Sequence, residues 1–307
     1  MTAPSLPEDP VGLHGDFWTR FLLGVLRRFP AWFCVGITWP LTLFFYTLAA
    51  RQRRAVQANL RALKSDWSWL TLQLASYRVF AEFALAYMDR MWSLHLGQQI
   101  EWDAEDYSHL NAQLHVSTGV LLFTTHSGNF DVGATFLSHH FPRPIHVVRL
   151  RERSESLHEF REAELKEAAK AHPGLQVHYA SDDWNLGIEL CRLLRAGEVV
   201  AVQGDRAPDA AHAVQFTHEE ISYRLPKGPL VLAQIARVPC YPIFVRRLGR
   251  CRYCIRTGPP FYDGHEKKTA EEIGAAWVGA MAEFVSQHWA QWFVFEHTVE
   301  RTDPASA

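Results

Sequence analysis

From residue 120 onward, apolar and polar residues alternate in a pattern that predicts strands and helices in turn. Short, continuous apolar runs, typical of buried strands, are separated by longer stretches in which apolar residues recur every three to four positions. The predicted strands are 120–124, 145–148, 175–179, 199–203, 213–224, 240–246 and 252–257. The predicted helices between and after them are 129–140, 154–171, 182–195, 226–237 and 269–289. This alternation indicates an α/β fold in which helices flank a central, mostly parallel sheet.

The N-terminal part of the chain has a helical pattern throughout. Residues 51–95 are predicted to form helices, because apolar residues between Trp67 and Trp92 recur at spacings of three and four. Before them, 29–50 is a run of 22 residues without a charge. Three structures suit this run: one helix that spans a bilayer, a bent helix or hairpin that lies in the membrane interface, or a buried core helix. Pro40 is expected to kink or break a helix here, and the Trp and Tyr residues of the run favour the interface.

Charge is unevenly distributed between the two parts. The whole chain of 307 residues has a net charge of −2, which excludes a strongly basic nucleic-acid binder. Residues 1–64 alone carry eight Arg or Lys and three acidic residues, hence a net charge of +5. A basic segment rich in arginine suits phosphate groups and an anionic membrane surface. We therefore expect residues 1–64 to form basic, apolar membrane-docking helices and residues 65–307 to form one α/β domain.

The five cysteines do not have the arrangement of a disulfide-stabilised protein. Their number is odd and their spacing irregular, which suits a reducing, cytosolic environment. Cys251 and Cys254 have the spacing of half a zinc site, but no second pair accompanies them in the sequence. We therefore expect no metal site.

The strongest candidate for chemistry is the segment 124–131, Thr-Thr-His-Ser-Gly-Asn-Phe-Asp, where a predicted strand passes into a predicted helix. His126 stands at the turn, and Asp131, one turn into the helix, is close enough in sequence to reach back to the ring. A carboxylate on one ring nitrogen would fix the tautomer and leave the other nitrogen as a general base toward a hydroxyl. Ser127 or Asn129 can cap the helix, whose free N–H groups suit a phosphate or a developing oxyanion. Both residues are therefore candidates for binding the substrate.

This segment resembles the H-x-x-x-x-D/E motif of the lysophospholipid acyltransferase superfamily. Within that superfamily it is similar to the branch of bacterial lipid A biosynthesis lauroyl/myristoyl acyltransferases and phosphatidylinositol mannoside acyltransferases, which read T-x-H-x-G-N-W/F-E/D. The resemblance covers about residues 18–297, in the family order. The other matching stretches are the basic segment 53–60, the Gly-Glu-strand-Asp segment 194–205, the proline-containing segments 225–230 and 238–245, and the Gln-Trp segment 291–295.

The resemblance implies that a fatty acyl group moves from an acyl thioester to a hydroxyl of a lipid or glycolipid. The thioester would be carried by acyl-carrier protein or coenzyme A as a co-substrate, with no further cofactor. His126 would be the base and Asp131 its partner. The implied location is the cytoplasmic face of the inner membrane, as a peripheral or single-pass protein. Asp131 and Phe130 stand where lipid A enzymes usually have Glu and Trp, so the identity of the acceptor stays open.

The resemblance also implies residues that bind the substrate. Arg161, in the helix after the second strand of the domain, would hold a phosphate or another anion of the acceptor. The alternatives are the arginines at the end of that strand, Arg149, Arg151 and Arg153. Asp205 and Arg206 follow another predicted strand, at the edge where open α/β sheets bind ligands. There Asp205 would orient Arg161 or the acceptor, or would cap a turn.

Two functions of other classes are compatible with the sequence. The first is a lipid acyl hydrolase, although the chain has no G-x-S-x-G motif that would present a serine nucleophile. The second is a non-catalytic lipid-binding protein. Release of free fatty acid without an acceptor would identify the hydrolase, and lipid binding without turnover would identify the binding protein.

Overall fold

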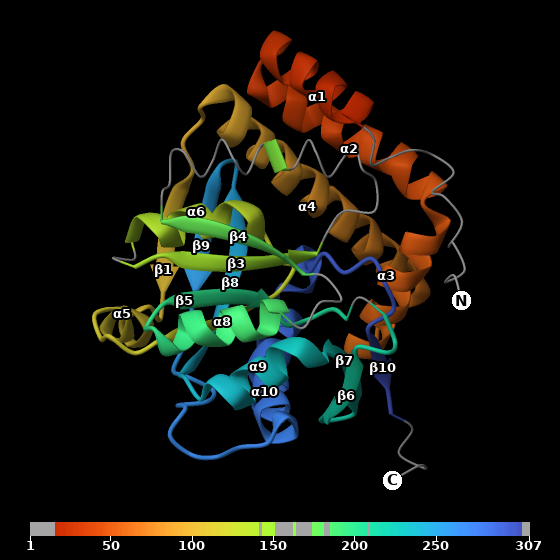
Figure 1. Cartoon of the computed structure of the whole chain (residues 1–307). Helices are drawn as coiled ribbons and strands as arrows, with labels where there is room; N and C mark the ends of the chain where they lie inside the picture. The colour runs from red at the N-terminus through yellow and green to blue at the C-terminus, as the bar shows by residue number, and fades with distance from the viewer. Residues whose placement is uncertain are drawn as a thin grey trace, which may run out of the picture.

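A seven-stranded sheet forms the centre of the computed structural model, which describes residues 16–140, 143–150, 162–163, 174–180, 185–207 and 209–302 (Figure 1). In spatial order its strands are β1 (Glu101–Glu105), β9 (Arg252–Arg256), β8 (Cys240–Gly249), β2 (Val120–Thr124), β5 (Val199–Gln203), β3 (Ile145–Leu150) and β4 (Leu175–Ala180). Every neighbouring pair is parallel except β8 and β9. This confirms the predicted α/β fold with a mostly parallel sheet.

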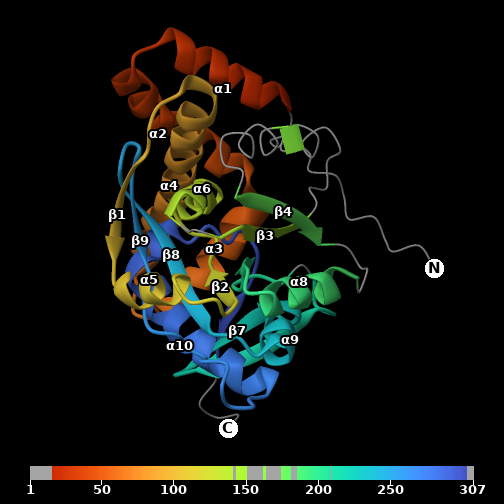
Figure 2. The same ribbon diagram turned by 60° about the vertical axis from the view of Figure 1, so that its left-hand side comes forward.

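Helices cover both faces of the sheet (Figure 2). On one face lie α8 (Asn185–Arg195), α9 (Lys227–Ala236) and α10 (Ala270–His288), and on the other lie α5 (Ser108–Leu114) and α6 (Phe130–His140). Successive side chains of a strand point to opposite faces, so Leu121 and Phe123 of β2 pack toward α10 while Val120 and Leu122 pack toward α6. Burial on both faces explains why the central strands are continuous apolar runs in the sequence.

A small second sheet lies beside α10. The stretch expected as one strand at 213–224 is a hairpin of β6 (Ala213–His218) and β7 (Ile221–Pro226). The short C-terminal strand β10 (Val299–Arg301) pairs antiparallel with β7. Through β10 the end of the chain is attached to the domain core.

In the described part of the chain, four helices precede the central sheet and lie above it and to its right in Figure 1. They are α1 (Asp16–Arg28), α2 (Ala31–Leu48), α3 (Ala50–Leu63) and α4 (Trp69–Leu96). The long α4 begins at the N-cap Ser68 and ends at Gly97, which adopts the left-handed conformation at φ +67°. Helix α1 packs on the C-terminal half of α4, α2 packs along most of its length, and α3 packs on its N-terminal half and on β10. Thus α4 connects the N-terminal helices to the sheet domain.

Two predictions from the sequence concern Pro40 and the helix at 154–171. Pro40 was expected to kink or break the apolar run, but α2 is one continuous helix with Pro40 inside it. Packing along α4 supports the helix there, and the Tyr77 hydroxyl of α4 donates to the Trp39 carbonyl at 2.8 Å. The helix expected at 154–171 lies almost wholly outside the described residues.

Candidate active site

The sheet register brings His126 and Asp205 together. Thr124, the last residue of β2, pairs with Gln203, the last residue of the neighbouring strand β5. His126 and Asp205 each follow two residues later, so the two side chains meet at the carboxyl edge of the sheet. The Nδ1 atom of His126 lies 2.7 Å from Oδ1 of Asp205, and the His126 backbone N–H donates to Oδ2 at 2.8 Å. This contact leaves Nε2 of the ring as the nitrogen turned away from the carboxylate.

Asp205 is fully buried yet remains a carboxylate. Burial alone would raise the pKa of this carboxyl, but the charge of His126 and three sets of hydrogen bonds together lower the pKa below its usual value. The donors are the His126 ring, the His126 backbone N–H and the indole N–H of Trp292, which lies 2.9 Å from Oδ2. A negative carboxylate fixes the tautomer of His126 and stabilises the ring when it gains a proton.

The turn that carries His126 requires a glycine. Gly128 has φ +55°, a conformation that favours glycine, and a Cβ there would lie 2.5 Å from the Val245 carbonyl oxygen. The C-terminal segment 291–293 lies against the same turn. The Phe293 N–H donates to the His126 carbonyl at 2.7 Å, and the Gly128 N–H donates to the Gln291 carbonyl at 3.2 Å. The position of His126 is therefore set by β8 on one side and by the segment 291–293 on the other.

Ser127 and Asn129, the candidate helix caps and substrate-binding residues, have protein partners. Ser127 is fully buried, and its hydroxyl lies 2.8 Å from that of Thr125. The Asn129 amide is also buried and donates to the Ala86 carbonyl of α4 at 3.3 Å and to the Tyr253 hydroxyl at 3.5 Å. In this structure both side chains stabilise the turn.

The other predicted site residues are only partly covered by the structure. Arg149 is the next-to-last residue of β3, and Arg206 directly follows Asp205. Both side chains are half-buried. Asp131 lies in the first turn of α6, but its side chain is outside the described part of the chain. Arg161 and its alternatives Arg151 and Arg153 are outside it as well.

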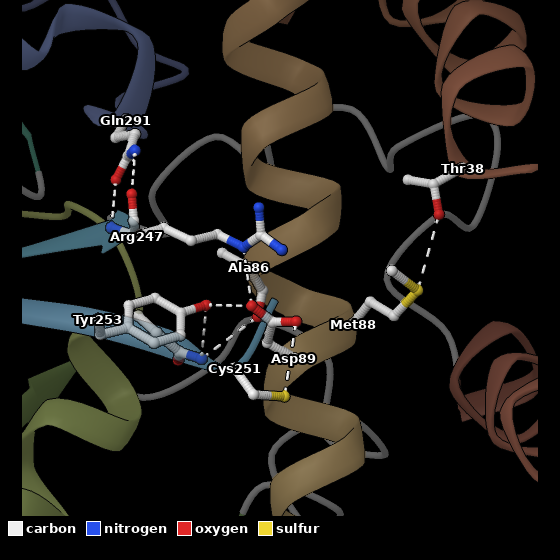
Figure 3. Close-up of polar contacts among 9 residues, drawn as sticks. Thr38, Ala86, Met88, Asp89, Arg247, Cys251, Tyr253 and Gln291 are labelled. Carbon is white, nitrogen blue, oxygen red and sulfur yellow. Dashed lines mark hydrogen bonds and ion pairs between the residues drawn. The ribbon is translucent and has the colours of Figure 1, made fainter. Parts of the chain in front are cut away.

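A buried polar network lies behind the active-site turn, and sequence reasoning did not identify it (Figure 3). Asp89 of α4 is fully buried and accepts hydrogen bonds from Arg247 Nε at 2.7 Å and from the Tyr253 hydroxyl at 2.8 Å. Burial alone would lower the pKa of Arg247, but the hydrogen bond and charge of Asp89 raise it, so this is an ion pair. Gln291 holds the Arg247 backbone, with Nε2 donating to its carbonyl at 2.9 Å and Oε1 accepting from its N–H at 2.6 Å. The sequence signal for this network was the charged pair at positions 89 and 90 inside the mostly apolar second half of α4.

An apolar cavity opens beside the His126 turn, between α6 and the carboxyl half of the sheet. The ring of Phe130, one of its lining residues, lies edge-on to the His126 ring with centroids 5.2 Å apart. Most other lining side chains are aliphatic, among them Leu137, Val147, Val177, Ile243 and Val245. Such a cavity suits a hydrocarbon chain more than a polar group.

No group of three or more His, Cys, Asp or Glu residues that could hold a metal ion occurs in the part of the chain that the structure describes. All five cysteines are free and buried. Cys251 lies in the turn before β9, and its thiol donates to Asp89 Oδ1 at 3.8 Å. Cys254 lies in β9 itself.

The family model for bacterial lipid A biosynthesis acyltransferases matches residues 13–299 of this chain. No curated protein matches this chain. The matched range contains His126, Asp205, Trp292 and the helices α1 to α4.

Proposed function

We propose that this chain uses His126 as the general base of an acyl transfer. The premise is that the chain belongs to the bacterial lipid A biosynthesis acyltransferase family and is therefore a lipid acyltransferase. In this proposal a fatty acyl group moves from an acyl thioester of acyl-carrier protein or coenzyme A to a hydroxyl of a lipid or glycolipid. The single observation that carries the proposal is the contact between His126 and the buried carboxylate of Asp205.

The reaction follows from the geometry of this pair. Nε2 of His126 takes the proton of the acceptor hydroxyl as its oxygen attacks the thioester carbonyl carbon. The tetrahedral intermediate then breaks its carbon–sulfur bond, and the departing sulfur takes the proton from Nε2. The products are an ester and a free thiol, and the histidine is neutral again. Throughout, Asp205 holds Nδ1 and stabilises the transient imidazolium.

Asp131 is the partner predicted from the motif spacing, and Asp205 is the residue in contact with the ring. We assign to Asp205 the role of orienting the ring. For Asp131 the motif prediction stands, and variants of the two residues distinguish their contributions. Arg161, Arg149 and Arg206 stay proposals for the group that binds an acceptor or donor phosphate.

The apolar cavity beside Phe130 supports an acyl substrate. It lies under α6, next to the His126 ring, so a chain bound there would present its thioester carbonyl near Nε2. Gly133 lines this cavity, and a Cβ at this position would lie 3.0 Å from Val245 Cγ2, so a larger residue would reduce its width. The depth of the cavity would limit the length of the chain.

Exposed apolar residues support association with a membrane. In the described part of the chain, α2 is the helix that is long and apolar enough to cross a bilayer. Only 17% of its residues are buried. The large apolar side chains exposed on α2 and on the first turns of α4 include Trp32, Trp39, Leu43, Phe44, Trp69, Leu70 and Leu74. Exposed arginines stand just before and just after α2, including Arg28 and Arg51. An apolar face with basic flanks suits an anionic lipid surface. Because acyl thioesters are cytosolic donors, we place this contact at the cytoplasmic face of the inner membrane.

Intact-mass lipidomics tests the function and identifies the acceptor in one experiment. Cells that lack the protein are compared with cells that regain it as wild type or as His126→Ala. We expect a lipid species heavier by one fatty acyl group to disappear in the deletion strain and to return only with the wild type. Free fatty acid released in vitro without an acceptor would instead identify a hydrolase. Lipid binding without any acyl transfer would identify a binding protein.

A further inference from the structure

We propose that Trp292 is a positioning residue for the acyl-transfer site, where its indole N–H holds Asp205 so that the other carboxylate oxygen meets His126. This inference rests on the proposed function, in which His126 is the base. Trp292 acts through Asp205 and not on the substrate. The residue lies 87 positions from Asp205 in the sequence, and its role follows from the fold alone.

The donors around the Asp205 carboxylate are arranged so that they fix its orientation. Oδ1 of Asp205 faces Nδ1 of His126 at 2.7 Å, while Oδ2 accepts from the His126 backbone N–H at 2.8 Å and from Nε1 of Trp292 at 2.9 Å. The carboxylate torsion of an aspartate is soft, so its orientation is set by its hydrogen bonds. Without the indole, Oδ2 would keep one backbone donor, and the carboxylate plane would be less strictly aligned with the imidazole.

Trp292 is itself rigidly placed. Its side chain is buried, its backbone forms an isolated antiparallel bridge with Ser127, and the neighbouring Phe293 N–H donates to His126. Further along, Asn59 of α3 fixes the same segment. Asn59 Nδ2 donates to the Val294 carbonyl at 3.4 Å and to the Glu296 carbonyl at 2.8 Å. The indole is thus a donor attached to the same turn that it helps to organise.

Trp292 is also a donor without a charge. An indole N–H supports the ionised form of Asp205 without adding a positive charge, whereas a Lys or Arg at this place would neutralise the carboxylate. A neutral donor leaves the negative charge of Asp205 available to the imidazolium of His126. The indole also keeps its proton at every pH at which the protein is folded, so this hydrogen bond does not titrate.

The test compares two tryptophans that differ in what they hold. Trp277 is also fully buried, and its Nε1 donates at 2.8 Å to the carbonyl of Gly204, the residue just before Asp205. Trp292→Phe and Trp277→Phe therefore remove similar volumes and similar hydrogen bonds, but only the first removes a donor from the carboxylate. We expect Trp292→Phe to lower kcat by roughly ten- to a hundredfold, the equivalent of one charge-assisted hydrogen bond, and Trp277→Phe to lower it by less than about threefold.

A second readout does not depend on turnover. In histidine-labelled protein, the NMR signal of the His126 ring N–H that faces Asp205, identified by its loss in His126→Gln, is compared between the wild type and the two variants. Because the indole of Trp292 orients the carboxylate that accepts this N–H, the chemical shift of the signal should change in Trp292→Phe and stay in place in Trp277→Phe. If the wild type transfers no acyl group, the proposed function fails, while this chemical shift still decides the role of Trp292.

If Trp292→Phe does not fold, replacing Trp292 by 3-benzothienylalanine removes the N–H and keeps the ring shape. The same loss of kcat and the same change of chemical shift are expected. A folded Trp292 variant whose kcat and His126 ring N–H signal both match those of Trp277→Phe would overturn the proposal. In that case Trp292 would serve packing alone.

Discussion

At the residue scale, both oxygens of Asp205 are occupied by hydrogen-bond donors, so a change of this side chain should act directly on the His126 ring. In Asp205→Asn the amide would donate to Nδ1 or leave it without a charged partner, which favours the wrong tautomer. We expect kcat to fall by about 10²–10⁴-fold with little change in thermal stability. Steady-state kinetics and a melting curve measure the two effects.

Asp131→Asn is the matched comparison for that prediction. Asp131 is the motif acid, five positions after His126, and receives the identical chemical change. A normal kcat in Asp205→Asn, with a severe loss in Asp131→Asn, would transfer the role of ring partner to Asp131.

Gly128 is a second residue at which the structure makes a definite prediction. An alanine there would combine a left-handed backbone with a Cβ only 2.5 Å from the Val245 carbonyl oxygen. We expect Gly128→Ala to lower the free energy of unfolding by about 3–5 kcal/mol. Gly97 also has a positive φ but open space around its Cβ position, so Gly97→Ala should cost only about 1–2 kcal/mol. Equal losses in the two variants, measured by chemical denaturation, would show that the contact with β8 is not restrictive.

At the element scale, α2 offers a test of membrane association that leaves the fold intact. Trp32 and Phe44 are 76% and 56% exposed, so Trp32→Ser with Phe44→Ser should not disturb the core. Each large apolar side chain buried in lipid contributes about 1.5–3 kcal/mol, so the double variant should bind anionic vesicles at least about a hundredfold more weakly. A matched pair, Ile188→Ser with Ile235→Ser, changes similarly exposed residues on α8 and α9. Vesicle flotation should show no effect of that pair, and equal effects of both pairs would argue against a docking role of α2.

The β3–β4 edge of the sheet contains a histidine pair with a predictable pH response. His146 Nδ1 lies 2.9 Å from His178 Nε2, and Glu198 and Glu189 contact the outer nitrogens of the two rings. Burial, with the charge of His146, lowers the pKa of His178 below 6.5, although Glu189 opposes this. The unfolded chain therefore binds this proton more readily than the folded protein, and stability falls as pH drops below about 6.5.

The variant His178→Gln isolates this contribution. Between about pH 7 and pH 5 the melting temperature of this variant should fall less than that of the wild type, because the penalty for protonating His178 is absent. His115→Gln, a change at an exposed histidine, should follow the wild type. Parallel curves for wild type and His178→Gln would contradict the lowered pKa.

At the scale of the whole molecule, the active site is assembled from distant parts of the chain. His126 and Asp205 come from the central sheet, Trp292 from the C-terminal segment, and the buried Asp89 from a helix that also carries α1 and α2. The helices proposed to contact lipid and the turn that carries the base therefore share one packed helix, α4. The family match covers the N-terminal helices as well as the sheet domain.

Sequence reasoning predicted the elements of this molecule better than their contacts. The central strands were predictable because burial on both faces makes them continuous apolar runs. The edge strand β1 (Glu101–Glu105) was missed because it is mostly polar and exposed, and β10 because it has three residues. His126 was identified from its strand-to-helix turn. Its contact with Asp205 was not, because spacing along the chain does not reveal that β2 and β5 are neighbours in register.

The central claim is that this chain transfers an acyl group to a hydroxyl with His126 as the base. The most direct measurement is the initial rate of ester formation by purified full-length protein in lipid vesicles, with an acyl thioester donor and the acceptor named by lipidomics, for wild type and His126→Ala. We predict that His126→Ala forms ester about 10²–10⁴-fold more slowly, while its melting temperature stays close to that of the wild type. An ester-forming rate within about fivefold of the wild type would contradict the account, because transfer would then not depend on the base.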